Sequence, residues 1–387
     1  MRIFHISDLH IGKQLYGYSL REEQAHILQS IIAYGREYKP DVLVIAGDIY
    51  DKAAPSAEAY DLFNQFLNDL SELTERMPVL VIAGNHDNGA RLQYASDFLE
   101  RSHIYVSAKA PAEGEALKQL VLQDDYGPVH FYLLPFIRPR DVRHLFDEGV
   151  VTSYDSAVQA VLEREQIDYS QRNVLVAHQF FVAGETAPVL CESEQSSLSV
   201  GGIDSVDVGH VQQFDYVALG HIHGPQKIGG DHIRYSGTPL KYSVSEARHQ
   251  KGITLVTLGE KGAPPQIELL PLTALRDVRT LQGTLAEVLA QAGDAGQDDY
   301  VSVTLTDEEP LYRPKDQLEE RYHRILEVRL DNRRIRQKLS ADLSCEEHLQ
   351  PFEAFQAFYQ EMNGQPLSGE EGRLMADIIA AAAEEVQ

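Results

Sequence analysis

The fold is decided by the stretch Val42-Leu43-Val44-Ile45-Ala46-Gly47-Asp48-Ile49-Tyr50-Asp51, a short apolar run that stops abruptly at a glycine and an aspartate. A run this short and this rich in β-branched residues is typical of a strand buried on both faces. We therefore expect Asp48 to lie where the strand leaves the core, with its carboxylate facing a cleft.

Four other apolar runs end in the same way, each in an aspartate, a histidine or an asparagine. They cover residues 3–10, 79–87, 174–178 and 216–223. Open α/β sheets bind their ligands at the carboxyl ends of the strands. Five strands that deliver such side chains to their carboxyl ends predict a metal site in an α/β domain.

Amphipathic helix patterns separate these strands and cover residues 21–32, 55–70, 90–99 and 154–165. After residue 223 the strand patterns follow one another closely, which indicates antiparallel pairing. We expect one domain, residues 1–272, that mixes parallel βαβ units with antiparallel strands. Residues 183–202, which are rich in Gly, Ser and Glu, predict a long loop beside the site.

The rest of the chain divides into three expected parts. Residues 273–331 predict a small α+β domain, and residues 332–341 form a basic linker. Residues 342–387 are strongly acidic and carry two amphipathic helix patterns, for which docking to a partner helix is favoured over burial in the protein's own core. The linker is either solvated or in contact with DNA, and both readings stay open.

Composition restricts the class of protein. The chain has 387 residues with 34 basic and 59 acidic side chains, a net charge of −25, and no run near the roughly 20 apolar residues of a membrane span. We expect a cytoplasmic globular protein without a membrane segment. Its charge has the wrong sign for binding DNA, so a DNA substrate requires divalent metal, local basic patches or a partner. Cys191 and Cys345 lie far apart and predict neither a disulfide framework nor a thiolate metal site.

The strand ends offer more metal ligands than one ion needs. The seven candidates are Asp8, His10, Asp48, Asn85, His178, His221 and His223. A carboxylate can bridge two ions about 3.5–4 Å apart, so Asp48 can join one ion on Asp8, His10 and His223 to a second on Asn85, His178 and His221. Nitrogen and oxygen ligands without thiolate suit Mn²⁺ or Fe²⁺ better than structural zinc. The expected chemistry is hydrolysis of an anionic phosphodiester.

Two residues beside the ligands are candidates for proton transfer. His86 follows Asn85 and is not needed as a ligand, so we assign it as the general acid for the leaving group. Asp87 is a candidate to orient His86. Arg138 and Arg140 either hold phosphates or form ion pairs with Asp141, and the sequence does not separate the two.

Six motifs in order carry a resemblance to a known family. They are Ser-Asp-Leu-His-Ile-Gly-Lys at 7–13, Ala-Gly-Asp-Ile-Tyr-Asp at 46–51, Gly-Asn-His-Asp at 84–87, Pro-Phe-Ile-Arg-Pro-Arg-Asp at 135–141, Ala-Leu-Gly-His-Ile-His at 218–223 and Tyr-Ser-Gly-Thr-Pro at 235–239. The chain resembles the calcineurin-like metallophosphoesterase superfamily and, within it, the SbcD-type nuclease subunits, the bacterial counterpart of the eukaryotic double-strand-break repair nuclease. The resemblance implies a four-layer α/β/β/α sandwich with a small α+β capping domain and a C-terminal helical tail.

The resemblance also implies an activity and partners. The family's pattern makes the same seven residues the ligands of two Mn²⁺ ions, with Fe²⁺ or Mg²⁺ as possible substitutes, and makes His86 catalytic. Other relatives carry a second histidine where this chain has Asp51, so Asp51 joins the catalytic group only with an orienting role. Lys13 joins Arg138 and Arg140 as a candidate substrate-binding residue.

The implied function is that of the nuclease subunit of an SbcCD-type complex that processes DNA ends and hairpins. It includes 3′–5′ double-strand exonuclease and single-strand endonuclease activity, a homodimer, and an SbcC-type coiled-coil ATPase bound through the C-terminal helices. Two alternatives stay open. One is a small-molecule phosphodiesterase or phosphatase of the same superfamily, and the other is a DNA-end scaffold in which cleavage is incidental.

Overall fold

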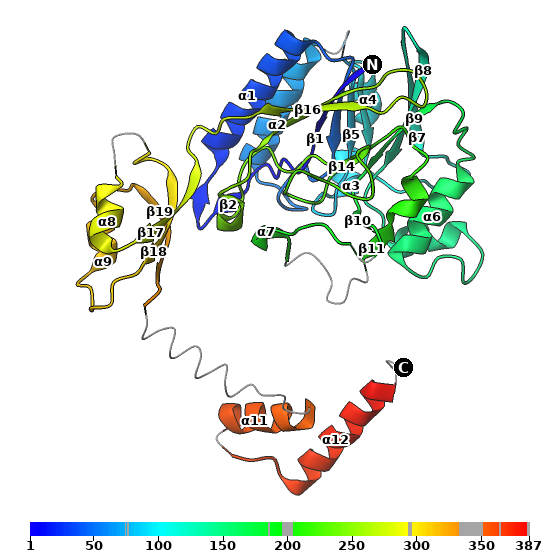
Figure 1. The fold of residues 1–387 in the computed structure, drawn as a ribbon. Helices are drawn as coiled ribbons and strands as arrows, with labels where there is room; N and C mark the ends of the chain where they lie inside the picture. Colours follow the sequence, from blue (N-terminus) through cyan, green and yellow to red (C-terminus); the bar gives the residue numbers. More distant parts are fainter. Residues whose placement is uncertain are drawn as a thin grey trace.

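The computed structural model is described here for residues 1–73, 75, 77–184, 186–195, 204–292, 296–332, 351–363 and 365–384. Two six-stranded sheets pack face to face, and helices cover their outer faces (Figure 1). The expected four-layer α/β/β/α sandwich is therefore present.

The first sheet has four parallel strands and, at one edge, a pair of strands that are antiparallel to each other. Its strands, in spatial order, are β16 (Gln266–Pro271), β15 (Gly252–Thr257), β1 (Arg2–Ile6), β4 (Val42–Ala46), β5 (Val79–Ile82) and β6 (Ile104–Ser107). Strands β1, β4, β5 and β6 run parallel, whereas β15 is antiparallel to both β1 and β16. All five residues of β4 are buried, as the apolar run predicts.

The second sheet repeats this plan with antiparallel strands at both edges. Its strands, in spatial order, are β13 (Gln226–Lys227), β14 (Ile233–Tyr235), β12 (Tyr216–Leu219), β9 (Arg172–Ala177), β8 (Gly127–Leu134) and β7 (Lys118–Asp124). Strands β14, β12, β9 and β8 are parallel. Smaller strands pair outside the two sheets: β2 (Gln14–Leu15) with β3 (Tyr18–Ser19), and β10 (Phe180–Val182) with β11 (Ser205–Asp207).

Three apolar cores hold the layers together. Between the sheets, Val44 and Ile82 of the first pack with Phe131, Val176 and Tyr216 of the second. Outside the first sheet lie α1 (Arg21–Tyr38) and α2 (Ala57–Ser71), and outside the second lies α6 (Tyr154–Arg164). Because the helices bury the outer faces and the sheets bury each other, the strand ends remain the place where polar side chains can gather.

One predicted helix is wrong in its extent. The helix expected over residues 90–99 is two short helices, α3 (Gly89–Leu92) and α4 (Ser96–Glu100), separated by Ala95 with φ of 62°. A residue in the left-handed region cannot continue an α-helix, so the chain turns there. The helices α1 and α6 begin at the predicted residues 21 and 154, although α1 continues beyond the predicted residue 32 to Tyr38, and α2 begins two residues after the predicted start. The side chain of Ser56 accepts a hydrogen bond from the Ala59 N–H at the start of α2.

Residues 273–331 form three parallel strands with two helices. The elements are β17 (Val278–Gly283), α8 (Leu285–Ala290), β18 (Tyr300–Leu305), α9 (Pro314–Glu319) and β19 (Arg324–Leu330), and they enclose a small core of their own. This part contacts α1 through the buried carboxylate of Glu23, which accepts hydrogen bonds from Arg276 and from the Tyr300 hydroxyl at 3.0 Å. The division of the chain at residues 272 and 331 stays a prediction.

The last described elements are α11 (Pro351–Asn363) and α12 (Gly369–Glu384), which contact each other (Figure 1). The hydroxyl of Tyr359 in α11 donates to Glu371 in α12 at 3.0 Å. The basic residues predicted for the linker, Arg333, Arg334, Arg336 and Lys338, lie outside the described residues, as does Cys345. Among the helices that the structure describes, none is long and apolar enough to cross a membrane.

Candidate metal centre

The seven predicted ligands come together at the carboxyl ends of five parallel strands. Asp8 and His10 follow β1, Asp48 follows β4, Asn85 follows β5, His178 follows β9, and the pair His221 and His223 follows β12. Ligand atoms within 4.8 Å of one another form one group of Asp8, His10 and His223 and a second of Asp8, Asp48 and His178. The structure thus joins residues from both sheets in one site.

The backbone is in an unusual conformation at four of these seven residues. The φ angles are 52° at Asp8, 42° at His10, 49° at Asp48 and 100° at His221. Non-glycine residues rarely adopt positive φ, and each such residue costs on the order of 1–3 kcal/mol. The surrounding backbone holds two of them, because the N–H of Asp8 donates to Gly47 O and that of His10 to Asp48 O, each at 3.0 Å. Strain concentrated on candidate ligands indicates a built functional site.

Glycines allow close approaches of the chain at this edge, between the two sheets at Gly220 and within the first sheet at Gly84. A Cβ on Gly220 would lie 1.9 Å from the carbonyl oxygen of Ala46, and one on Gly84 would lie 2.1 Å from Asp48 Oδ1. Neither position can hold a side chain without moving backbone or ligand. Gly220 therefore brings the end of β12 against the end of β4.

Asp48 lies between two groups of donors. Its Oδ2 is 3.4 Å from His178 Nε2 and 3.7 Å from His10 Nε2. On one side, His10 Nε2 faces His223 Nε2 at 3.2 Å. On the other, Asn85 Oδ1 is 3.1 Å from His178 Nε2 and 2.9 Å from the Nδ1 of the next histidine, His221. This grouping has the form of the division expected from the sequence, with a carboxylate between two sets of ligands.

Hydrogen bonds leave a ligand nitrogen available on His178. Its Nδ1 lies 2.7 Å from the carbonyl oxygen of Ala46, which only accepts, so Nδ1 carries the proton. Nε2 is the nitrogen left for a metal ion, and it faces Asp48 and Asn85. His10 differs from His178, because its buried Nδ1 has no hydrogen-bond partner among the described residues and no hydrogen bond fixes which of its nitrogens carries the proton.

The charges of the centre suit a cation. Burial raises the pKa of Asp8. Burial also acts to raise that of Asp48, but the charges of His178 and His10 hold the pKa of this carboxyl well below its usual range. Burial lowers the pKa of His178, yet the Asp48 and Asp8 carboxylates raise it to about 9. Burial lowers the pKa of His221 to about 3, which leaves a neutral imidazole.

Two buried carboxylates, several imidazoles and an amide oxygen form a donor set for divalent ions that prefer nitrogen and oxygen ligands, and imidazoles bind such ions in their neutral form. No thiolate takes part in this donor set. The residues therefore fit two such ions.

His86 is held by a backbone carbonyl rather than by Asp87. Its Nδ1 lies 2.9 Å from Asp51 O, and its ring centroid is 4.9 Å from that of His10. The carboxylate of Asp87 instead accepts the backbone N–H groups of Ile49, Tyr50 and Gly84 at 2.9–3.1 Å. The expectation that Asp87 orients His86 is thus wrong, because Asp87 ties the loops after β4 and β5 together. A group of His86, His10 and Asp48 also has ligand spacing.

The predicted substrate-binding residues lie at different distances from the centre. The guanidinium of Arg138 is 5.1 Å from the ring centroid of Phe136, and that ring stacks on His221 at 6.3 Å. Arg138 is therefore beside the ligands. Arg140 is exposed, with its Nε 3.7 Å from a carboxylate oxygen of the adjacent Asp141. Lys13 forms an ion pair of 2.8 Å with the carboxylate of Asp51 at the rim of the site.

Sequence reasoning missed a polar cluster behind His223. The Oγ of Ser193, in α7 (Glu192–Gln195), lies 2.8 Å from His223 Nδ1 and donates to Glu246 at 3.0 Å. Glu246 and Lys251 are both buried and form an ion pair of 2.6 Å. These residues follow no strand-end pattern, and their only sequence signal is polar character near the Tyr-Ser-Gly-Thr-Pro motif.

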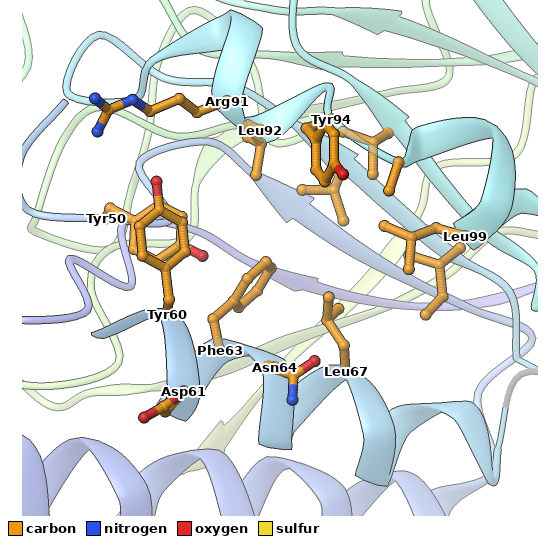
Figure 2. A pocket seen from close by; sticks show the side chains of 14 residues that line it. Tyr50, Tyr60, Asp61, Phe63, Asn64, Leu67, Arg91, Leu92, Tyr94 and Leu99 are labelled. Carbon is orange, nitrogen blue, oxygen red and sulfur yellow. The ribbon is translucent and has the colours of Figure 1, made fainter. Parts of the chain in front are cut away.

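A separate cavity of about 410 Å³ lies between α2 and the short helices α3 and α4 (Figure 2). Its wall is mostly apolar, and Tyr60, Phe63, Leu67, Tyr94 and Leu99 point toward it. None of the seven candidate ligands lines it. None of the groups with metal-ligand spacing found among the described residues lines this cavity, so the strand-end site is the candidate centre.

Comparisons with known proteins identify the family of the chain. The model of the calcineurin-like phosphoesterase family matches residues 1–225, and a model described as the type 5 capsule protein repressor C-terminal domain matches residues 274–363. The SbcD subunit of the nuclease SbcCD from Staphylococcus saprophyticus is 34% identical over 293 residues, which span 75% of this chain and 74% of that protein.

Two solved structures are more distantly similar. TT1561 of Thermus thermophilus matches with a TM-score of 0.40 and 13% identity, over 69% of this chain and 98% of that one. A dimetal phosphatase from Danio rerio matches with a TM-score of 0.37 and 12% identity, over 70% of this chain and 99% of that one.

Proposed function

The chain belongs to the SbcD-type nucleases of the calcineurin-like phosphoesterase family, and on this premise we propose that it is the DNA-cleaving subunit of an SbcCD-type complex. Its reaction is hydrolysis of DNA phosphodiester bonds, as a 3′–5′ double-strand exonuclease and a single-strand endonuclease acting on DNA ends and hairpins. The observation that carries the proposal is the convergence of seven nitrogen and oxygen donors from two sheets at one edge.

Two Mn²⁺ ions are the proposed cofactor, with Fe²⁺ or Mg²⁺ as substitutes. Asp8, His10 and His223 would hold one ion, Asn85, His178 and His221 the other, and Asp48 would bridge them. Such a pair supplies a hydroxide nucleophile near neutral pH and offsets charge on the phosphoryl group.

The protein's own contribution to proton transfer is assigned to His86. Because Asp51 O can only accept, the Nδ1 of His86 carries a proton, and its Nε2 is the atom that gains and gives a second one. His86 is only partly buried, so Nε2 can face a leaving oxygen. Asp51 orients His86 through its carbonyl group, and its carboxylate holds Lys13.

Incubation of the purified chain with Mn²⁺ and linear duplex DNA tests the activity. Release of nucleotides supports the nuclease. Inertness toward DNA, combined with turnover of a small phosphodiester such as bis(p-nitrophenyl) phosphate, would instead favour a small-molecule phosphodiesterase. Retention of full repair activity in cells by an Asp48→Asn variant would favour a scaffold role.

The proposal includes weak DNA binding by this subunit alone. The net charge of −25 opposes a polyanion, and Arg138 is the one proposed phosphate contact that packs beside the ligands. We expect the ATPase partner to supply most of the attraction. A nanomolar dissociation constant of the isolated chain at physiological salt would contradict this.

The partner is proposed to be an SbcC-type coiled-coil ATPase that binds α11 and α12. Phe358, Met362 and Leu374 are 59%, 68% and 63% exposed, so these helices present apolar side chains to solvent. Exposed apolar side chains on amphipathic helices suit docking against another helix. A cytoplasmic location is part of the same proposal.

A homodimer is also proposed, with its contact at the apolar cavity of Figure 2. Tyr94, which lines this cavity, and the nearby Phe98 are 83% and 68% exposed. Exposed apolar patches of this kind mark interaction sites. Light scattering on a Tyr94→Ser variant should show loss of dimer, whereas Tyr312→Ser, at a similarly exposed tyrosine in residues 273–331, should leave the mass unchanged.

A further inference from the structure

The two histidines that contribute Nε2 from the second sheet are oriented by different means. His178 donates its Nδ1–H to the backbone carbonyl of Ala46, the last residue of strand β4. Among the described residues, none offers such a carbonyl to Nδ1 of His223. Its hydrogen-bond partner there is the side-chain hydroxyl of Ser193, 2.8 Å away on the short helix α7, and the carboxylate oxygen Oε1 of Glu246 lies farther off, at 3.6 Å from the same nitrogen.

The hydrogen-bond geometry fixes where the proton of Ser193 points. Its Oγ lies 3.0 Å from Glu246 Oε1, and an ionised carboxylate has no proton to give. The hydroxyl must therefore donate to Glu246, since otherwise two oxygens with lone pairs would face each other at 3.0 Å. The lone pairs of Ser193 Oγ are then left for His223, so Nδ1 must carry the hydrogen. An imidazole protonated on Nδ1 keeps Nε2 free, and Nε2 is the atom that faces His10.

The surroundings of Glu246 keep its carboxylate ionised and fixed in one orientation. It is fully buried, and its Oε2 is 2.6 Å from Lys251 Nζ and 3.2 Å from Thr238 Oγ1. Its Oε1 also accepts from Ser243 Oγ at 2.9 Å. Lys251 donates in addition to the carbonyl oxygen of His223 at 2.9 Å. A buried carboxylate with this many donors has one available orientation, so the hydroxyl of Ser193 has a fixed target.

Helix α7 also accepts a hydrogen bond from the backbone of His223. The N–H of His223 donates to the buried carboxylate of Glu194, which also accepts the N–H of Cys191 at 2.5 Å. Ser193 and Glu194 are neighbours, so a single turn of chain contacts both the ring and the main chain of the same histidine. Any displacement of α7 would change both contacts together.

We propose that Ser193, backed by Glu246 and Lys251, is a positioning residue that sets the tautomer of His223 and thereby the affinity of one of the two metal sites. The proposal rests on the proposed function in taking His223 as a ligand. It adds that α7 controls this ligand, whereas His178 is set by the sheet itself. Partners of a ligand histidine commonly change metal affinity by about 10–100-fold when removed.

The first test measures Mn²⁺ binding by isothermal titration calorimetry on the full chain. Ser193→Ala should weaken one class of site by about 10–100-fold and leave the other unchanged. Ser243→Ala is the matched control, because it removes the same kind of bond to the same Glu246 oxygen without touching His223. Ser193→Thr, which keeps the hydroxyl, should restore binding. Equal effects of Ser193→Ala and Ser243→Ala would overturn the proposal.

The second test reads the tautomer itself in metal-free protein with ¹⁵N-labelled histidine. At a pH of about 9, where free imidazole is neutral, long-range ¹H–¹⁵N spectra should show His223 protonated on Nδ1 in wild type and in Ser243→Ala, and a mixture of tautomers in Ser193→Ala. If His223 is protonated on Nε2 in the wild type, the proposal that Ser193 sets its tautomer is wrong. This readout needs no DNA, so the two proposals can fail separately. Failure of the nuclease assay would contradict the proposed function, and the spectra alone would decide whether Ser193 sets the tautomer of His223.

Discussion

The metal centre and the C-terminal helices contrast in how their side chains are brought together. Asp8 and His178 are fully buried, lie 170 positions apart in the chain, and meet only because two sheets pack face to face. Phe358 and Met362 are four residues apart on α11 and largely exposed. Chemistry in this protein thus depends on tertiary structure, whereas the proposed partner contact depends on local helical periodicity. The two should be separable by mutation.

The largest expected effect is that of Asp48→Asn, which removes the carboxylate proposed to bridge the two ions but keeps a side-chain oxygen that can accept the backbone N–H of His86. We expect loss of at least about 10³-fold in nuclease activity, since a metal pair supplies several kcal/mol of stabilisation to the transition state. Bound Mn²⁺ should fall as well, which calorimetry measures. Asp124→Asn, the same change remote from the centre, serves as control and should retain both.

A smaller effect within the centre is expected from His86→Gln. General acid catalysis contributes about 10²–10⁴-fold, so kcat should fall by that order while two Mn²⁺ ions remain bound. The measurement pairs a cleavage assay with anomalous scattering from a crystal soaked in Mn²⁺. Loss of an ion together with activity would reassign His86 as a ligand, a role that its spacing to His10 and Asp48 also permits.

On the other side of the comparison, Met362→Glu should leave the centre untouched. A charge at this exposed position opposes burial against a partner, and interface anchors are worth at least about 2 kcal/mol, roughly 30-fold in affinity. Pull-down or calorimetry with the ATPase should show the loss, and Mn²⁺-dependent cleavage by the isolated chain should be unchanged. Gln360→Glu, also exposed on α11, is the matched control. Parallel loss of cleavage would show that the two regions are coupled.

The smallest effect concerns stability alone. Hydrogen bonds from Arg172, one of them 3.0 Å long, hold the pKa of Asp124 well below its usual range. The stabilisation is therefore present above the unfolded pKa of about 3.9 and is lost as the pH falls toward the folded value. Asp124→Asn should lower the free energy of unfolding near neutral pH by about 1.5–3 kcal/mol and flatten its decline below a pH of about 4. Urea titrations from neutral to acidic pH measure this, and an unchanged decline would contradict it.

The sequence predicts the residues at the strand ends because a polar side chain directly after a buried apolar run lies where the strand leaves the core. Asp8, Asp48 and His178 follow that logic. The break of the helix at Ala95 escaped prediction because alanine favours helices, and only the tertiary fold explains its φ of 62°. Asp87 was misassigned for a similar reason, since its partners are backbone N–H groups, which no side-chain motif reveals.

The polar cluster of Ser193, Glu246 and Lys251 marks a further limit. Each residue is an ordinary surface type in sequence, and their gathering around His223 depends on loops that lie far apart along the chain. Periodicity finds the ligands that strands carry. It does not find the polar side chains that contact those residues from behind.

The close approach at Gly220 has a practical consequence for protein design. An added methyl group there would overlap the Ala46 carbonyl, so β12 and β4 meet as bare main chain. Anyone transplanting the seven ligands onto another scaffold would have to copy this side-chain-free junction first.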